Sequence, residues 1–390
     1  MSQHTKVTTA GPTPHYHYVD ALRGYAILLV ITVHASQAAV GLGWPWRQLF
    51  DQGARGVQLF FVASALTLLM SWHARNDGAL PFYVRRCSRI LPMFWLALVF
   101  FVALNGFEPR YFAPNGIGPV HVLVTALSLH GWHPETITSV VPGSWSIADE
   151  MTFYLLFPPL VFLIRGWRSA ALALILAMLL SNALFDFVGS NRSLMWHGQS
   201  DALVSTFIHL WFPTQFPVFL VGFLVYFFIR EWRGRLSLWA LRVMLLCAVS
   251  TMVALCFVSE SSFHGFHLMP AVYYAICFGL FTFCLAEGVG GWLVNAPICF
   301  LGKVSFGAYL WHFAILETLS RLARSGVDPL NLLGEPHGMP FFIMFFPSLL
   351  ASTVFLSAIT YRLVERPMIE AGNRLLRRTS LVTCNDAARA

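Results

Sequence analysis

The sequence predicts an all-α polytopic membrane protein, a bundle of about ten transmembrane helices with both termini in the cytoplasm. The chain of 390 residues is 57% hydrophobic and only 11% charged, whereas a soluble domain is about 25% charged. A mean hydropathy of +0.65 agrees with that composition. Two further observations define the arrangement, namely the apolar runs and the distribution of the basic residues.

Ten apolar runs recur along the chain. They cover residues 18–40, 55–72, 90–104, 149–164, 169–188, 204–229, 237–258, 268–287, 303–320 and 340–362. An extra run at 119–130 is shorter and suits a re-entrant or surface helix better than a crossing. We therefore divide the chain into a polar cytoplasmic N-terminal segment, 1–17, a transmembrane domain, 18–370, and a cytoplasmic C-terminal tail, 371–390.

Basic residues indicate the orientation of these spans, because cytoplasmic loops are enriched in Lys and Arg. With ten crossings and cytoplasmic termini, 19 of the 25 basic residues lie inside. The six outside are Arg47, Arg55, Arg110, Arg192, Arg321 and Arg324. A crossing at 119–130 would move Arg165 and Arg168 outside and invert every later loop. The charges therefore favour ten spans, and the net charge of +7 reflects topology rather than nucleic-acid binding.

The first apolar run, YVDALRGYAILLVITVHAS, carries Asp20, Arg23 and His34. Ionisable side chains inside a span are costly and tend to mark functional sites. In one helix, the stretch from Arg23 to His34 rises about 16 Å through roughly three turns, so the two side chains share a face. Asp20 joins that face. We expect this face to line a site.

Three arginines, Arg85, Arg86 and Arg89, precede the third span on the predicted cytoplasmic side. Arg86 and Arg89 are three residues apart and therefore lie together on a helix. Guanidinium groups at that spacing suit the phosphates of a nucleotide cofactor. The alternative is a positive-inside anchor that contacts lipid head groups.

The segment PGSWSIADEMTFYLLFPPL carries Glu150 into the start of an apolar run. Ser146 followed by Asp149 fits a capping box, which predicts that a helix begins there on the outer side. A carboxylate near a helix N-terminus has a structural explanation, because it interacts favourably with the helix dipole. The functional alternative is that Glu150 meets His34, since both approach the outer half of the bilayer.

Other polar residues give weaker indications. His312 and Glu317 lie in the ninth apolar run, where a lone histidine is more often structural than catalytic. The seven cysteines show no CxxC pair and no metal spacing, so we expect no metal site. The absence of a Walker A motif, a nucleophile elbow and HExxH disfavours nucleotide-driven pumping and membrane zinc proteolysis.

Several segments, taken in order, make the chain resemble acyltransferase family 3, the integral-membrane O-acyltransferases that include O-antigen and exopolysaccharide acetylases. The matching positions are Arg23 with His34, Phe60 to Ser64, Arg86 with Arg89, Trp145 to Pro158, Ser305 to His312, and Glu365 to Pro367. Each motif is weak alone, whereas the ordered set is specific and covers nearly the whole chain. Departures occur after Ser64, where Ala65 and Leu66 replace Gly and Phe, and at Met151, where the family commonly has a second Glu.

The resemblance implies an enzyme, an acyltransferase transferring groups other than amino-acyl groups, of the O-acetyltransferase kind. It implies transfer of an acyl group, usually acetyl, from cytoplasmic acyl-CoA to a hydroxyl of a cell-envelope or exported sugar, and hence polysaccharide modification. The expected partners are acyl-CoA (usually acetyl-CoA), a carbohydrate or glycolipid acceptor and the lipid bilayer, without nucleic acid. The expected location is the bacterial cytoplasmic (inner) membrane.

On this interpretation, His34 is the general base, because an alcohol attacks a thioester only when a base takes its proton and imidazole titrates in the right range. Glu150 and Arg23 are the other catalytic candidates. Glu150 would orient the acceptor or the imidazole, and Arg23 would stabilise donor charge or the developing oxyanion. Arg86 and Arg89 would bind the phosphates of acyl-CoA.

Two alternatives stay open at this point. Direct transfer and a covalent acyl-His intermediate fit the sequence equally well. A polytopic transporter or flippase of a glycan or small molecule also fits, because such proteins place Arg, His and Glu along a conduction path.

Overall fold

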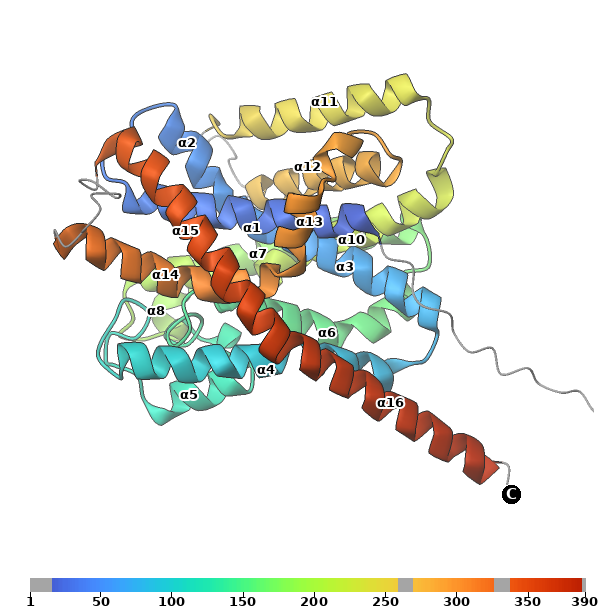
Figure 1. The fold of residues 1–390 in the computed structure, drawn as a ribbon, viewed down its shortest axis with the longest axis horizontal. Helices are drawn as coiled ribbons and strands as arrows, with labels where there is room; N and C mark the ends of the chain where they lie inside the picture. Colours follow the sequence, from blue (N-terminus) through green and yellow to red (C-terminus); the bar gives the residue numbers. More distant parts are fainter. Residues whose placement is uncertain (1–15, 259–268, 326–336, 388–390) are drawn as a thin grey trace, which may run out of the picture.

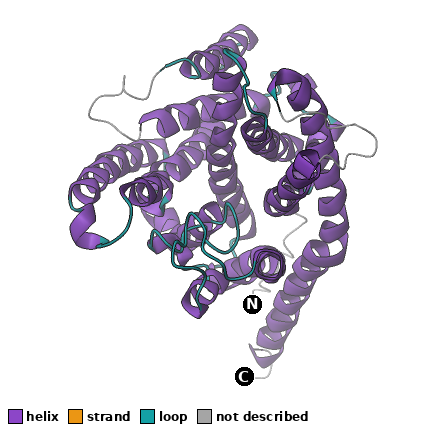
Figure 2. Ribbon diagram, turned by 90° about the vertical axis from the view of Figure 1, so that its left-hand side faces the viewer, coloured by secondary structure: helices purple, strands orange, loops and turns teal. Residues whose placement is uncertain are grey.

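The computed structural model describes residues 16–258, 269–325 and 337–387, and Figure 1 shows its helices. The long helices are α1 (His17–Ala38), α3 (Gly56–Arg75), α4 (Ala79–Asn105), α6 (Trp145–Leu163), α7 (Trp167–Ser190), α10 (Phe212–Trp232), α11 (Leu238–Leu255), α12 (Met269–Ala286), α14 (Ser305–Ser325), α15 (Gly338–Thr360) and α16 (Arg366–Ala387). Shorter helical elements are α2 (Trp46–Asp51), η1 (Gln52–Arg55), α5 (Pro119–Ala126), η2 (His130–Trp132), α8 (Arg192–Met195), α9 (Asp201–Leu210), η4 (Gly291–Leu293), α13 (Ala296–Lys303) and η5 (Tyr361–Glu365). These ranges contain no strand (Figure 2).

The helices confirm the prediction of an all-α polytopic membrane protein. In the described part of the chain, eight helical segments are long and apolar enough to cross a membrane, and the bent pair α13 and α14 would add a ninth. α12 is a shorter apolar helix, so every predicted apolar run contains a helix. The extra run at 119–130 forms α5, whose 8 residues are too few to cross a bilayer.

The two ends of the bundle are defined by the ends of the chain. α1 begins and α16 ends on the same side, at the right in Figure 1. We call that side the near end, and the opposite side, where α1 ends, the far end. The predicted segment 1–17 lies outside the described residues except for Tyr16 and His17, and the predicted tail 371–390 is helical as far as Ala387.

α1 occupies the middle of the bundle, packed against α3, α13, α14 and α15. Its contact with α13 depends on two glycines. A Cβ at Gly302 would overlap the carbonyl oxygen of Asp20, and a Cβ at Gly24 would overlap that of Ile298. Because glycine has no Cβ, the two backbones can approach closely here. This contact fixes the part of α1 that carries Arg23.

Stacked phenylalanines join α3, α6 and α10. The ring centroids of Phe61 and Phe219 are 4.3 Å apart, and those of Phe153 and Phe219 are 4.2 Å apart. All three rings are buried, and such pairs add about 0.5–1.5 kcal/mol each beyond their buried area. The stack therefore holds α3 and α6 in fixed positions relative to each other.

The predicted capping box at Ser146 and Asp149 is wrong. α6 begins at Trp145, close to the predicted start, but its N-cap residue, Ser144, makes no side-chain cap hydrogen bond. Ser146 Oγ instead donates to Tyr309 Oη at 2.8 Å. Both Ser146 and Asp149 are buried in the protein interior, so a motif that requires side chains folded back onto the helix end is not formed.

Candidate active site

Three cavities follow one another from the near end to the far end of the bundle. Their volumes are about 720 Å³ for the near cavity, about 630 Å³ for the central cavity and about 1150 Å³ for the far cavity. The near and central cavities share Arg23, Arg86 and Arg89 as lining residues. The central and far cavities share Val57 and Tyr309. The series therefore runs through the membrane-spanning part of the protein.

The wall between the near and central cavities is strongly basic. Arg23 Nη2 donates to Thr67 Oγ1 at 3.3 Å, and the Arg86 guanidinium lies 5.9 Å from the centroid of the Tyr154 ring. Among the described residues that line the central cavity, Glu150 is the single acidic one. Asp20 is the acidic residue among the described residues that line the near cavity. Three guanidinium groups thus face two carboxylates across the two cavities, an excess of positive charge that suits a polyanion.

The arginine cluster on α4 divides into two parts. Arg86 and Arg89 line the cavities, whereas Arg85 forms hydrogen bonds of 2.6 and 2.8 Å to both carboxylate oxygens of Asp77. Arg85 does not line the near or the central cavity. The two residues singled out by their spacing are therefore the two that face the cavities.

Glu150 belongs to the central cavity. Its Oε1 accepts hydrogen bonds from Ser64 Oγ and from Tyr154 Oη, each at 2.6 Å. The sequence suggested a meeting with His34, but the hydrogen bonds of Glu150 in the described structure do not include His34. The structure brings Glu150 together with Arg23, Arg86 and Arg89 instead. Its position near the helix N-terminus does not indicate this grouping, which depends on how α3 and α4 pack against α6.

His34 lines the far cavity and is partly buried. Its Nδ1 lies 3.0 Å from Gln37 Oε1. An amide oxygen only accepts hydrogen bonds, so Nδ1 is the donor in this contact. The ring centroid of His34 lies 4.6 Å from that of Phe313 and 5.2 Å from that of His312. His34 thus lies at the edge of the far cavity, and in the neutral tautomer that this contact favours Nε2 is the basic nitrogen.

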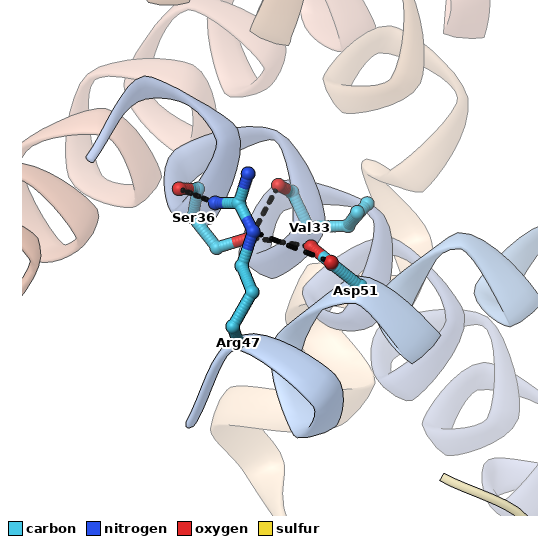
Figure 3. A network of polar contacts seen from close by, with 4 residues as sticks. All are labelled: Val33, Ser36, Arg47 and Asp51. Atoms are coloured by element: carbon cyan, nitrogen blue, oxygen red, sulfur yellow. Dashed lines mark hydrogen bonds and ion pairs between the residues drawn. The ribbon is translucent and has the colours of Figure 1, made fainter. Parts of the chain in front are cut away.

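α2 holds the end of α1 that carries His34 (Figure 3). Arg47 Nη1 donates to the Ser36 carbonyl oxygen at 2.7 Å, and Arg47 Nε lies 3.3 Å from Asp51 Oδ2. Ser36 Oγ donates to the Val33 carbonyl oxygen at 2.8 Å. The last carbonyl groups of a helix lack partners within the helix, so these contacts stabilise the turn beside His34.

Two residues of α14 lie near His34, His312 by ring contact and Tyr309 as a second lining residue of the far cavity. The sequence singled out His312 but favoured a structural role for it, and it did not single out Tyr309. His312 is fully buried, and its Nδ1 lies 3.2 Å from the Ala308 carbonyl oxygen. Its Nε2 has no hydrogen-bond partner among the described residues. Tyr309 Oη donates to the Gly143 carbonyl oxygen at 2.8 Å. The two histidines are far apart in the chain, and no spacing rule connects them.

A second buried polar cluster lies at the start of α6. Asp149 is fully buried, and neither carboxylate oxygen has a partner among the described residues. His130, in the loop before α6, donates from Nε2 to the Ser144 carbonyl oxygen at 3.1 Å. Burial lowers the pKa of His130 from 6.5 to about 4. His130 is therefore neutral at physiological pH.

The side chains of the described residues include no group of three or more His, Cys, Asp or Glu placed to hold a metal ion. In the described part of the chain, the charged and imidazole side chains that line the three cavities are the guanidinium groups of Arg23, Arg86, Arg89 and Arg110, the carboxylates of Asp20 and Glu150, and the imidazole of His34.

Comparison with known proteins gives a family and several relatives. A family profile described as an acyltransferase domain, Acyl_transf_3, matches residues 16–362. The chain is 27% identical over 355 residues to the exopolysaccharide production protein ExoZ of Rhizobium meliloti, a match that covers 87% of this chain and 96% of ExoZ. It is 26% identical over 330 residues to the acyltransferase MdmB of Streptomyces mycarofaciens, covering 78% of this chain and 80% of MdmB.

The chain also resembles part of a longer protein, the peptidoglycan O-acetyltransferase OatA of Listeria monocytogenes. The two are 21% identical over 393 residues, and the match covers 94% of this chain but 58% of OatA. No solved structure matches the chain.

Proposed function

This chain belongs to the acyltransferase 3 family, and we propose that it transfers an acyl group, acetyl in the first instance, from acyl-CoA at the near end to a sugar hydroxyl at the far end. Family membership makes it an acyltransferase, as the sequence predicted. The O-acetyltransferase relative supports acetyl as the group transferred. The relatives give no support to the transporter alternative. The observation that carries the proposal is the series of cavities that joins three arginines to His34.

The near end receives the donor. The excess of basic residues predicts that this end faces the cytoplasm, where acyl-CoA is made. Arg86 and Arg89, with Arg23, bind the phosphates, since guanidinium groups form bidentate hydrogen bonds with phosphate oxygens. The pantetheine arm then extends through the central cavity, and the helical rise of about 16 Å from Arg23 to His34 is the distance that it must bridge.

Transfer takes place beside His34. Nε2 accepts the proton of the acceptor hydroxyl while the hydroxyl oxygen attacks the thioester carbonyl carbon. The carbon–sulfur bond breaks, the new ester keeps the acyl group, and the imidazolium returns the proton to the departing thiolate of CoA. Gln37 supports this direction of proton transfer, because its hydrogen bond keeps the other proton on Nδ1. The step needs no oxidant or further reactant.

Glu150 and Arg23 take roles at the central cavity. The hydrogen bonds from Ser64 and Tyr154 support a Glu150 that positions Tyr154 and balances the arginines. Arg23 lines the near and central cavities and not the far one. That placement supports donor binding by Arg23 over stabilisation of an oxyanion next to His34.

The far cavity receives the acceptor. It is lined by aromatic and polar side chains, among them Tyr111, Trp145, Thr138 and Arg110. Aromatic rings pack against the apolar faces of sugars, and polar groups bind their hydroxyls. The names of two relatives refer to exopolysaccharide and peptidoglycan. We therefore assign the acceptor to the cell-envelope or exported carbohydrates and the protein to the bacterial inner membrane.

The donor assignment is tested by replacing the two cavity-lining arginines of α4 and, in a separate variant, Arg85. The double variant Arg86→Ala with Arg89→Ala should raise the KM for acetyl-CoA by at least about tenfold, because each lost phosphate contact removes a charge-assisted hydrogen bond. Arg85→Ala is the matched control and should keep the KM of the unchanged protein, since Arg85 pairs with Asp77. An unchanged KM in the double variant would show that these arginines are topological anchors only.

A further inference from the structure

We propose that a fourth cavity at the near end, which we call the side cavity, binds the 3′-phosphoadenosine part of CoA. This proposal rests on the proposed function, because it names where the nucleotide of the donor lies. The side cavity has a volume of about 850 Å³ and lies between the start of α1 and the ends of α3 and α10.

Aromatic side chains form one part of its lining. They are Tyr16, Tyr18, His73 and Tyr226. His73 stacks on Tyr226, with ring centroids 5.1 Å apart and an angle of 24° between the planes. Tyr18 is fixed by a contact from its hydroxyl to the Met70 sulfur at 3.9 Å. Flat rings in a cavity are suited to a purine, because every base has a face that stacks on aromatic side chains.

Arginines form the other part of the lining. Arg230 and Arg233 lie at the exposed end of α10, and none of the described residues that line the side cavity is acidic. The turn after Arg233 is held by a hydrogen bond from the Gly234 backbone N–H to Glu287 Oε2 at 2.8 Å. A pair of guanidinium groups beside stacked rings suits a nucleotide that carries a phosphate on its ribose.

The side cavity is continuous with the donor path. It shares Tyr16, Met70 and Ala74 with the near cavity, which Arg23, Arg86 and Arg89 also line. CoA has the same order of groups, since its diphosphate connects the phosphoadenosine to the pantetheine arm. With the diphosphate at Arg86 and Arg89 and the arm in the central cavity, the side cavity lies where the nucleotide must go.

Anionic lipid is the competing ligand for Arg230 and Arg233, because exposed arginines at a membrane border attract lipid phosphates. Lipid head groups would use the two cations but not the four rings. The side cavity has both the two arginines and the four rings, and it shares lining residues with the near cavity. This combination favours the nucleotide.

The test uses the purified full chain and adenosine 3′,5′-bisphosphate, which is the nucleotide part of CoA without the arm. We expect this probe to bind the unchanged protein. Tyr226→Ala should weaken binding by about 10-fold to 100-fold, the range expected for losing a base-stacking ring, and Tyr226→Phe should retain it. Arg230→Ala with Arg233→Ala should weaken binding by about tenfold. Arg235 lies on the same loop but outside the side cavity, so Arg235→Ala is the matched control.

A comparison of donors extends the test. The Tyr226→Ala and arginine variants should raise the KM for acetyl-CoA but leave transfer from S-acetylpantetheine, which lacks the nucleotide, unchanged. Equal probe binding by all variants, or loss of anionic-lipid binding alone, would overturn the side-cavity assignment while the transfer activity stands. Probe binding without transfer from either donor by the unchanged protein would overturn the proposed function and leave the nucleotide site in place.

Discussion

Glu150 shows how one residue acquires its role from its neighbours. In the sequence it is a carboxylate near a helix N-terminus, where the helix dipole alone would account for it. In the structure it accepts hydrogen bonds from the hydroxyls of Ser64 on α3 and Tyr154 on α6. It also lines the same cavity as three arginines. A buried carboxylate in such surroundings keeps the cations in place and limits their mutual repulsion.

Replacing Glu150 should therefore damage donor use. Glu150→Gln keeps the size of the side chain but removes the charge, and we expect kcat/KM for acetyl-CoA to fall by about 10-fold to 100-fold, the equivalent of one charge-assisted hydrogen bond. Glu317→Gln is the matched control, because Glu317 forms an ion pair with Arg321 away from the three cavities. A Glu150→Gln variant with normal kinetics would reduce Glu150 to a structural residue.

His130 makes the stability of the protein depend on pH. Its pKa is about 4 in the folded protein, lowered by burial from an ordinary value of 6.5. The unfolded chain therefore binds the proton more readily than the folded protein. The contribution to stability is fully present above pH 6.5 and is lost as the pH falls towards 4, by up to about 3 kcal/mol.

The measurement is the Tm of the purified protein at pH 7 and at pH 5. His130→Phe retains a ring against Phe94, whose centroid lies 5.7 Å from that of His130, but removes the titrating group. We expect the fall in Tm between the two pH values to be smaller in this variant than in the unchanged protein. His197→Gln, at an exposed position, should leave the fall unchanged. Equal falls in all three proteins would exclude His130 as the linked group.

The sequence identified candidate residues better than it identified their partners. Each of the five candidates lines at least one of the three cavities: Arg23, His34, Arg86, Arg89 and Glu150. Pairings across helices were not readable, because they depend on which helix faces lie together after folding. Ionisable residues within apolar runs are conspicuous, whereas a lone histidine such as His312 has a structural explanation until its neighbours are known.

At the scale of helices, the position of α1 relative to α13 is the most constrained feature. Backbone atoms of the two helices come so close at Gly24 and Gly302 that no side chain fits between them. α1 carries both Arg23 and His34, so any shift of this helix moves both ends of the donor path.

Gly302→Ala should consequently separate α1 from α13. We expect a loss of about 1–3 kcal/mol of stability, the usual result of inserting a methyl group into a packed contact, and a lower Tm in detergent. Gly291→Ala is the control, because a Cβ at Gly291 meets open space. An unchanged Tm in Gly302→Ala would mean that the backbones can separate without cost.

The helices themselves were largely predictable, and their ends were not. Hydrophobic runs located the helices in their order, because a bilayer requires apolar segments of set length. Of the ten predicted spans, eight or nine are long and apolar enough to cross in the described part of the chain. Local rules failed at the start of α6, where Ser146 bonds to Tyr309 of a distant helix. They also gave no indication of the bend of 79° between α13 and α14 at Val304.

At the scale of the whole molecule, the proposed function divides the reaction between two sides of a membrane. In this proposal the donor binds where the arginines lie and the acceptor enters beside His34, and Tyr309 lines both the central and far cavities. Only the acyl group with its carrier arm has to pass between them.

The most direct test is transfer of labelled acetyl from acetyl-CoA to cell-envelope glycans by membranes that contain the unchanged chain or His34→Ala at equal abundance. We predict label in glycans with the unchanged chain and a loss of at least about 100-fold with His34→Ala, the contribution expected of a general base. His197→Ala should transfer normally. Transfer by His34→Ala at the rate of the unchanged chain would contradict the account.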